Sequence, residues 1–198
     1  MVIGVARGGL IRLKQFNYIF TSNTNNVDLY SFISNPSIGY TGGNAVITIN
    51  SGVHIFSTTT GTAALRPGSF PSGVTVTLIN NGYISGKGGN GGNGGGYGNQ
   101  YGAGYGGAGG TALSASGISG FTFKVDNSSG TIRGGGGGGG GGIGLGVVAY
   151  GDTMIGNGGG GGGQGHDGGS GGPRGLTAVN DPGWSVNYQG SKGGDGSI

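Results

Sequence analysis

Residues 86–98 read GKGGNGGNGGGYG, and this stretch decides the fold because glycine returns at every third position. Positions 86, 89, 92, 95 and 98 are all glycine, and so are positions 88, 91 and 94, whereas the third register holds Lys87, Asn90, Asn93 and Gly96. A period of three is the repeat of the left-handed polyproline II helix, which has no internal hydrogen bonds. Its backbone groups must therefore bond to neighbouring segments or to water. The stretch predicts packed polyglycine II helices with two bare edges and one edge that carries side chains.

The same period occurs in other runs along the chain. The chain has five such runs, at residues 87–98, 101–110, 134–142, 156–175 and 190–196. Residues 134–142 are glycine throughout, which predicts a helix surrounded by other helices. Residues 158–175 are expected to form one continuous helix whose decorated register includes Gln164, Asp167 and Ser170.

The composition has a second interpretation, which is low-complexity disorder. The chain has 59 glycines and 5 prolines in 198 residues, and glycine loses more backbone entropy on ordering than any other residue. Lysine, asparagine and glutamine are nevertheless confined to one register of three. This restriction favours an ordered bundle, because a disordered run would tolerate these side chains at any of the three positions.

The first 85 residues predict strands instead of glycine helices. A first repeat unit at 46–55 (VITINSGVHI) aligns without a gap with a second at 76–84 (VTLINNGYI). A third unit at 123–132 (FKVDNSSGTI) matches with one inserted residue. Each unit reads as strand, Asn/Ser-Gly turn, strand, which is typical of a hairpin or a solenoid corner. Three similar units favour stacked solenoid-like rungs.

The expected fold is therefore all-β and irregular with essentially no α-helix. Leucine and methionine are sparse, glutamate is absent and no long amphipathic stretch occurs. We expect a β-rich attachment or shaft region at residues 1–85. A glycine-rich polyglycine II domain follows at residues 86–198, with an embedded β unit at residues 121–133.

Several classes of protein are disfavoured by the charged and metal-binding residues. Nine Lys and Arg against six Asp give a net charge of +3, but they are dispersed, so we expect no nucleic-acid partner. Cysteine is absent, the two histidines are far apart in sequence and no carboxylates cluster, so neither a metal, a cofactor nor an enzymatic activity is expected. His54, between Val53 and Ile55, is expected to face solvent.

The chain offers no obvious route into or across a membrane. The apolar N-terminal stretch is interrupted by Arg7 before it reaches the length of a signal peptide, and no window approaches a membrane span. We therefore expect no membrane insertion. A protein of this kind that acts outside the cell needs a carrier other than a signal sequence.

Aromatic residues gather in the segments between the glycine runs, at residues 97–105, 143–155 and 176–189. The candidate binding residues are Tyr97, Tyr101, Tyr105, Tyr150, Met154, Trp184 and Tyr188. Tyr and Trp provide large, rigid contact area at low entropic cost, and together with Asn, Ser and Gly they are typical of binding loops. The alternative is that these side chains only cap the ends of the glycine bundle.

The residues at 80–92 (NNGYISGKGGNGG), followed by glycine runs and short aromatic loops, resemble the receptor-recognising distal adhesins of tailed bacteriophages. The resemblance covers about residues 45–198, and some glycine-rich tail-fibre C-termini share it, so a separate tip protein and a domain of a longer fibre both remain open. It implies an N-terminal region docked on the tail fibre and a polyglycine II domain that displays variable loops. Those loops would contact a bacterial outer-membrane protein or a surface glycan, and the virion would carry the protein.

An ice-binding or purely structural glycine bundle is the alternative from a different class. Such a protein needs a flat, regular face of Thr or small apolar residues. The decorated register here carries Lys, Asn, Gln, Asp and Pro instead. The phage adhesin is therefore the favoured interpretation.

Overall fold

The computed structural model describes residues 15–93, 104–141 and 162–170, which form strands and irregular segments almost throughout. These residues contain one short helix, α1, at Leu29–Ile33. The strands are β1 (Phe16–Phe20), β2 (Thr24–Asn25), β3 (Val27–Asp28), β4 (Ala45–Ile49), β5 (His54–Phe56), β6 (Leu65–Arg66), β7 (Thr75–Asn80), β8 (Tyr83–Ser85), β9 (Thr122–Asp126) and β10 (Thr131–Arg133). The prediction of a strand-rich fold with almost no helix is confirmed for this part of the chain.

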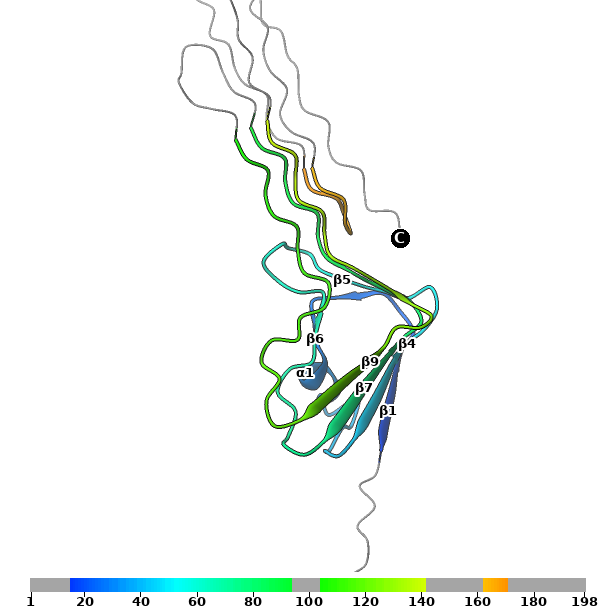
Figure 1. Ribbon diagram of the computed structural model, residues 1–198. Coiled ribbons are helices and arrows are strands. Elements are labelled where there is room, and N and C mark those ends of the chain that lie inside the picture. Colours follow the sequence, from blue (N-terminus) through cyan, green and yellow to red (C-terminus); the bar gives the residue numbers. More distant parts are fainter. Residues whose placement is uncertain (1–14, 94–103, 142–161, 171–198) are drawn as a thin grey trace, which may run out of the picture.

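The strands form three sheets in which every strand pairing is parallel (Figure 1). The two larger sheets have the orders β1-β4-β7-β9 and β10-β8-β5-β2, and the small one pairs β3 with β6. Consecutive strands such as β4 and β5 therefore lie in different sheets. The hairpin alternative for the repeat units is wrong, because a hairpin pairs consecutive strands in antiparallel fashion. We call residues 15–85 and 112–133 together the β part.

Alternating side chains of the sheets build one apolar core. Strand β4 buries Ala45, Ile47 and Ile49 and leaves the residues between them half-buried. A strand has a side-chain period of two, so these three residues share one face. The second large sheet contributes Ile55 and Ile84, which are fully buried as well. The apolar alternation of the sequence therefore specifies the inner face of both sheets.

The strand register shows where the alignment of the repeat units holds. Phe123 pairs with Val76, as the alignment of the third unit with the second predicts. Ala45 also pairs with Val76, which is one residue earlier than the gapless alignment of the first unit predicts, so that alignment is wrong. The cause is the corner between the two sheets, which takes residues 50–53 in the first unit and only residues 81–82 in the second.

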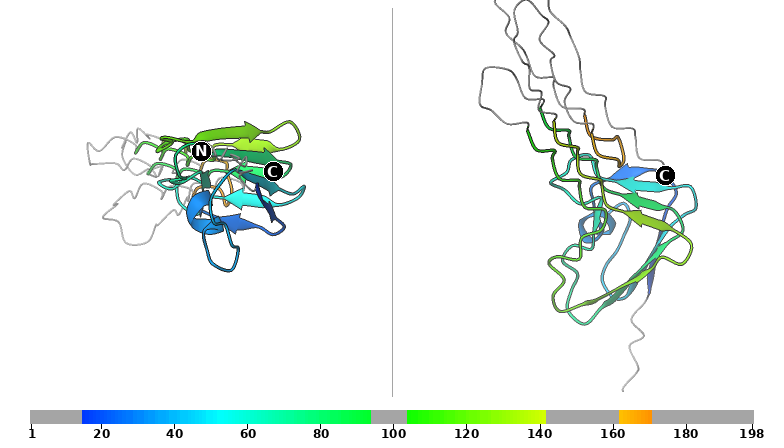
Figure 2. Two further views of the ribbon diagram at one scale, coloured as in Figure 1. Left: turned by 90° about the horizontal axis from the view of Figure 1, so that it is seen from below. Right: turned by 45° about the horizontal axis from the view of Figure 1, so that its top comes forward.

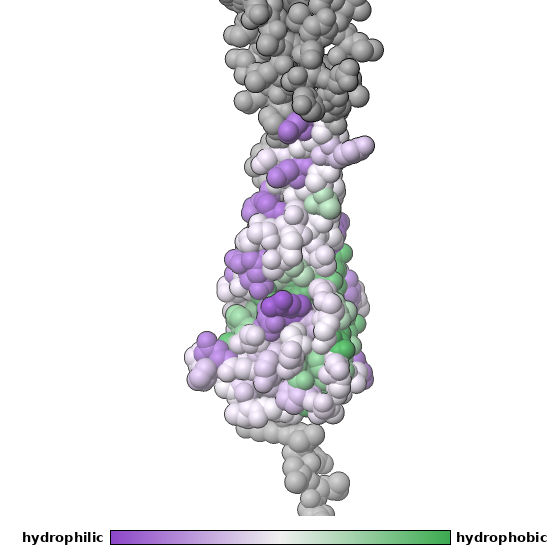
Figure 3. All heavy atoms as spheres, turned by 90° about the vertical axis from the view of Figure 1, so that its left-hand side faces the viewer, coloured by the Kyte–Doolittle hydropathy of each residue, from purple (hydrophilic) through white to green (hydrophobic). Residues whose placement is uncertain are grey.

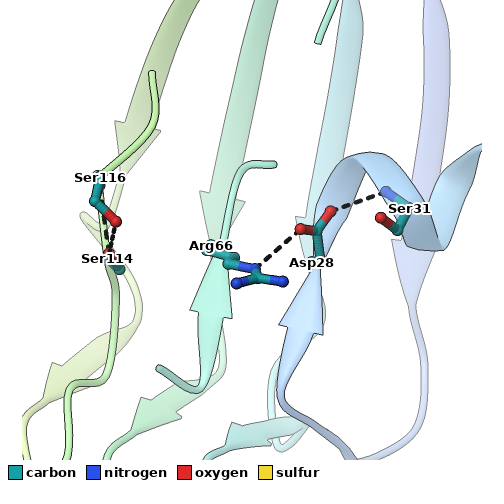
Figure 4. Close-up of polar contacts among 5 residues, drawn as sticks. All are labelled: Asp28, Ser31, Arg66, Ser114 and Ser116. Atoms are coloured by element: carbon teal, nitrogen blue, oxygen red, sulfur yellow. Dashed lines mark hydrogen bonds and ion pairs between the residues drawn. The ribbon is translucent and has the colours of Figure 1, made fainter. Parts of the chain in front are cut away.

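Asp28 on β3 connects the small sheet of β3 and β6 to α1 (Figure 4). One carboxylate oxygen accepts a hydrogen bond at 2.9 Å from the backbone N–H of Ser31 and so caps α1. The other accepts a hydrogen bond, also at 2.9 Å, from Nε of Arg66 on β6. Ser114 lies beside β6 of the same small sheet, because its backbone N–H donates to the carbonyl of Leu65 at 3.0 Å.

Four glycine-rich segments extend side by side from the β part (Figures 1 and 2), and we call them the stem. They are residues 86–93, 104–111, 134–141 and 162–170. Hydrogen bonds join two of the segments from the N–H groups of Gly135, Gly138 and Gly141 to the carbonyls of Gly110, Gly107 and Gly104, at 2.8, 2.8 and 2.9 Å. Gly107 and Gly110 donate in turn to Asn90 and Lys87, each at 2.7 Å. The backbone bonds therefore recur at every third residue.

The segments of the stem approach one another too closely for side chains on the contacting registers. A Cβ built on Gly92 would lie 1.9 Å from the carbonyl oxygen of Gly104, and one on Gly88 would lie 2.1 Å from that of Gly163. Only glycine leaves room for a neighbouring backbone at such distances. By contrast, the side chains of Asn90 and Asn93 belong to exposed residues, as the register predicts for the decorated edge. On the face shown in Figure 3 the stem is mostly neutral in hydropathy, with separate hydrophilic side chains.

The expectation that residues 134–142 are surrounded by other helices is wrong for the described residues 134–141. Gly134, Gly137 and Gly140 are exposed. A Cβ on any of them would lie at least 3.5 Å from the nearest atom outside its chain neighbours. Gly136 and Gly139 are exposed too, so this segment packs on some of its sides and leaves two of its three registers exposed to solvent.

The expected continuous helix at 158–175 is also wrong within residues 162–170, because the chain turns back on itself there (orange in Figure 1). The N–H of Gly168 donates to the carbonyl of Gly165 at 3.1 Å, and that of Gly169 donates to Gly163 at 2.8 Å. Asp167 and Gly168 have φ values of 56° and 27°, which are incompatible with a polyproline II helix. We call residues 162–170 the stem hairpin.

Strands β9 and β10 lie beyond the first glycine segments in sequence but belong to the β part. Strand β9 pairs with β7, and β10 pairs with β8. The chain therefore leaves the β part after β8, runs through the stem and returns. The division of the chain into two domains at residue 85 stays a prediction. Strands from both sides of residue 85 belong to the same sheets.

Candidate functional site

Tyr105 is the single predicted binding residue that the described part of the chain contains. Its side chain is almost fully exposed, at 98%. The backbone is fixed on both sides, because Gly104 donates to the carbonyl of Asn93 at 2.9 Å and Gly106 faces the carbonyl of Gly138. The stem therefore presents an aromatic ring to solvent from a backbone that packs against its neighbouring segments. An exposed phenol of this kind can stack on a ligand and can donate or accept a hydrogen bond.

The other six predicted residues lie outside the described residues. They are Tyr97, Tyr101, Tyr150, Met154, Trp184 and Tyr188. Tyr97 and Tyr101 fall between the described segments 86–93 and 104–111, and the remaining four follow residue 141. Their proposed role as a set stays a prediction.

The junction of the β part and the stem holds a cluster that the sequence did not predict. His54 on β5 is buried, with 2% exposure, so the expectation that it faces solvent is wrong. Its Nε2 is hydrogen-bonded to the hydroxyl of Ser85 on β8. The ring of His166 from the stem hairpin lies 4.6 Å from the His54 ring and stacks on Phe56 at 3.6 Å. The stem hairpin therefore covers this part of the sheet.

Backbone and side-chain contacts fasten the stem hairpin at this position. The N–H of His166 donates to the carbonyl of Gly86 at 3.1 Å. The ammonium group of Lys87 donates to the carbonyl of Asp167, also at 3.1 Å. The carboxylate of Asp167 lies 3.5 Å from Nε2 of His166. The first two contacts join residues that are about eighty positions apart in sequence.

The environment of His54 favours its neutral form. Burial is the largest cause that lowers the pKa of His54, to about 4, and the neighbouring His166 adds to the lowering. Asp167 acts in the opposite direction but does not outweigh these two. His54 therefore stays uncharged at neutral pH, where it serves as a hydrogen-bonding partner of Ser85.

A hollow of about 230 Å³ adjoins the cluster, between the second large sheet and the stem hairpin. It is lined by Tyr83, Ile84, Ser85, Thr131, Arg133, Gly134, Gly136, Gln164, Gly165 and His166. The alternation of apolar and polar residues in β8 and β10 indicates which side chains face this hollow. Ile84 and Ile132 are the apolar members of two alternating strands, so their neighbours Tyr83, Ser85, Thr131 and Arg133 share the opposite face.

The described residues show no group of three or more His, Cys, Asp or Glu side chains able to hold a metal ion. Within the same residues, no helix has the length and apolar character needed to cross a bilayer.

The comparisons with known proteins identify the family. No curated protein and no solved structure matches the chain. The sequence model of the family described as phage tail fibre adhesin Gp38 matches residues 15–197. This match spans the β part, the stem and the aromatic segments, and it confirms the resemblance drawn from the glycine and aromatic pattern. The chain therefore belongs to the phage tail fibre adhesin Gp38 family, and its place is the tail of a bacteriophage virion.

Proposed function

We propose that the chain is a receptor-recognising adhesin at the tip of the tail fibre, which binds an outer-membrane protein or a surface glycan of the host bacterium. The observation that carries this proposal is the family match over residues 15–197, which includes all seven predicted binding residues. The exposed ring of Tyr105 on the stem supports it. Recognition is the whole activity in this proposal, and no chemical step is attached to it.

The stem is, in this proposal, a polyglycine II bundle that acts as a rigid scaffold. The supporting observation is the period of three in the hydrogen bonds from Gly135, Gly138 and Gly141. Polyglycine II has three residues per turn and no internal hydrogen bonds, so bonds to other segments are expected at this spacing. A rigid scaffold favours tight binding, because loops held in their bound shape lose little entropy on association.

The β part is, in this proposal, a solenoid-like shaft that joins the stem to the tail fibre. Parallel pairing of β4 with both β1 and β7 supports it, since stacked rungs place equivalent strands of successive turns side by side. The attachment surface would lie in the β-rich region at residues 1–85.

The aromatic segments would provide the receptor contacts. Tyr and Trp are enriched among the residues that dominate binding energy at protein interfaces. Tyr150, Trp184 and Tyr188 come from two different segments, at 143–155 and 176–189, so both segments are assigned to the receptor-binding surface. Met154 adds a flexible apolar side chain that adapts to a partner.

The test is alanine substitution of Tyr150, Trp184 and Tyr188, singly and together, with binding to host envelopes and the melting temperature measured on each variant. We expect binding to weaken by about 2 kcal/mol or more at a dominant residue, with a melting temperature within a few degrees of the parent. Ile19→Ser is the matched control, since Ile19 is an exposed apolar residue (52%) on β1 of the β part. Loss of stability before loss of binding would show that these residues only cap the bundle.

A further inference from the structure

The tip of the stem hairpin, residues 165–168, rests on the β part, whereas its two arms belong to the stem (orange in Figure 1). In the first arm, the N–H of Gly163 donates to the carbonyl of Gly89 at 2.6 Å. In the second arm, the carbonyl of Ser170 accepts a hydrogen bond at 2.8 Å from the N–H of Gly91. Both bonds lie outside residues 165–168, so the tip can leave the sheet without breaking either of them.

The contact between the tip and the sheet is made by an aromatic ring that solvent already reaches. The ring of His166 stacks on Phe56 at 3.6 Å and lies edge-on to the ring of His54 at 4.6 Å. Its side chain is 22% exposed, and that of Asp167 is 61% exposed. Segments with little buried surface open at low free-energy cost. Release of the tip therefore requires the loss of these ring contacts and of the tip's two hydrogen bonds to the first residues of the stem.

A proton on His54 changes the energy of the covered position. His54 is buried, with 2% exposure, and its Nε2 is hydrogen-bonded to the hydroxyl of Ser85. This bond survives protonation, because the imidazolium donates from Nε2 and the hydroxyl oxygen accepts. The charge, however, is then confined beneath the ring of His166, where water does not reach it. A buried charge is costly unless a partner compensates it, so protonation favours any movement that lets water reach His54.

Charged and titratable groups from the neighbouring strands and from the stem surround His54 in the described part of the chain. Strands β8 and β10 contribute Tyr83 and Arg133, and the stem contributes Lys87, His166 and Asp167. Burial and the neighbouring His166 lower the pKa of His54 from 6.5 to about 4. The carboxylate of Asp167 acts in the opposite direction, but solvent screens it and it does not outweigh the other two. The covered form therefore disfavours the proton.

We propose that the tip of the stem hairpin is an acid-released latch, which leaves the sheet β10-β8-β5-β2 when His54 is protonated and returns when His54 loses the proton. The arms of the hairpin and the β part stay folded in both states. A ligand shifts a two-state equilibrium when it binds one state more tightly, and here the ligand is the proton, which prefers the released state. The ratio of released to covered chains therefore rises by at most tenfold for each pH unit between 6.5 and 4. The latch does not depend on the proposed receptor function.

The test is NMR spectroscopy of the full chain between pH 7.5 and 4, with isotope-labelled histidine and phenylalanine. The chain has two histidines, so their ring signals can be separated. The nuclear Overhauser effects between the rings of His166 and Phe56 should weaken progressively below pH 6.5 and recover on return to pH 7.5. Signals of core residues such as Ile47 should keep their native positions over the same range. Ring contacts that persist after His54 has titrated, or core signals lost together with them, would overturn the latch.

His54→Gln should keep the tip on the sheet down to pH 4. Asp167→Asn should move the release to a higher pH, because it removes a carboxylate that favours protonated His54 in the covered state. Asparagine tolerates the φ of 56° at this position, and Asp167 is exposed, so this variant keeps the test valid if His54→Gln does not fold. Asp126→Asn is the matched control, on β9 of the other large sheet, and should leave the release unchanged. Release of His54→Gln at the pH of the parent, or equal shifts in the two asparagine variants, would contradict the proposal.

Discussion

Gly138 faces the carbonyl oxygen of Asn90 so closely that an added Cβ would lie 1.9 Å from that oxygen. The neighbouring Gly137 has room, since its Cβ would lie 3.5 Å from the carbonyl oxygen of Gly107. Gly138→Ala should therefore destabilise the stem by about 1–3 kcal/mol or more, because the two segments must separate. Gly137→Ala should be neutral or slightly stabilising, since alanine lowers the entropy of the unfolded chain.

Thermal unfolding of the two alanine variants checks this prediction. They change adjacent residues in the same way, so each is the control for the other. Equal melting temperatures would show that the contact between residues 134–141 and Asn90 does not hold the stem together.

Valine substitutions test the division of the stem into bare and decorated registers. Gly92→Val and Gly162→Val place a branched side chain where a Cβ would already lie 1.9 and 1.7 Å from a carbonyl oxygen, so both should lower the melting temperature severely. Asn93→Val and Gln164→Val should be tolerated, because both residues are exposed. Similar losses in the two pairs would contradict the assignment of registers.

Acid should weaken the junction through His54. The pKa of His54 is lowered from 6.5 to about 4 in the folded chain, so the unfolded chain binds the proton first. Stability from this residue is therefore full above pH 6.5 and falls as the pH decreases towards 4, by up to about 1.4 kcal/mol per pH unit. Unfolding free energies of the parent and of His54→Gln between pH 4 and 8 measure the effect.

His166 and Asp167 are retained in His54→Gln, so the difference between the two pH profiles isolates His54. The parent should lose more stability than the variant between pH 6.5 and 4. Parallel profiles would show that burial of His54 does not disfavour its protonation.

Local patterns predicted those features of the fold that depend on local repetition. The strand-turn-strand pattern of the first unit predicted a strand at Ile47 and Ile49, and these two side chains share the inner face of β4 because a strand has a fixed period of two. The recurrence of glycine predicted the spacing of the bonds from Gly135 and Gly138, because glycine and these bonds both recur at every third residue. In both cases the repeat of the backbone is visible in the sequence itself.

Features that depend on contacts between distant residues could not be predicted in this way. His54 is buried because His166 packs against it from the stem hairpin, and no local pattern reveals that contact. The turn at residues 165–168 interrupts a run that still has period three in its sequence. The length of the corner between the two large sheets is another such feature. Four residues, 50–53, form this corner in the first repeat unit, and two residues, 81–82, form it in the second.

The central claim is that the aromatic segments determine which host is recognised, whereas the stem only displays them. The most direct measurement is host range after residues 143–155 and 176–189 are exchanged together for those of another adhesin of the family. A chimera with an unchanged melting temperature should attach to the donor's host and lose attachment to the original one. A well-folded chimera that keeps the original host range would contradict the account and would place recognition in the β part.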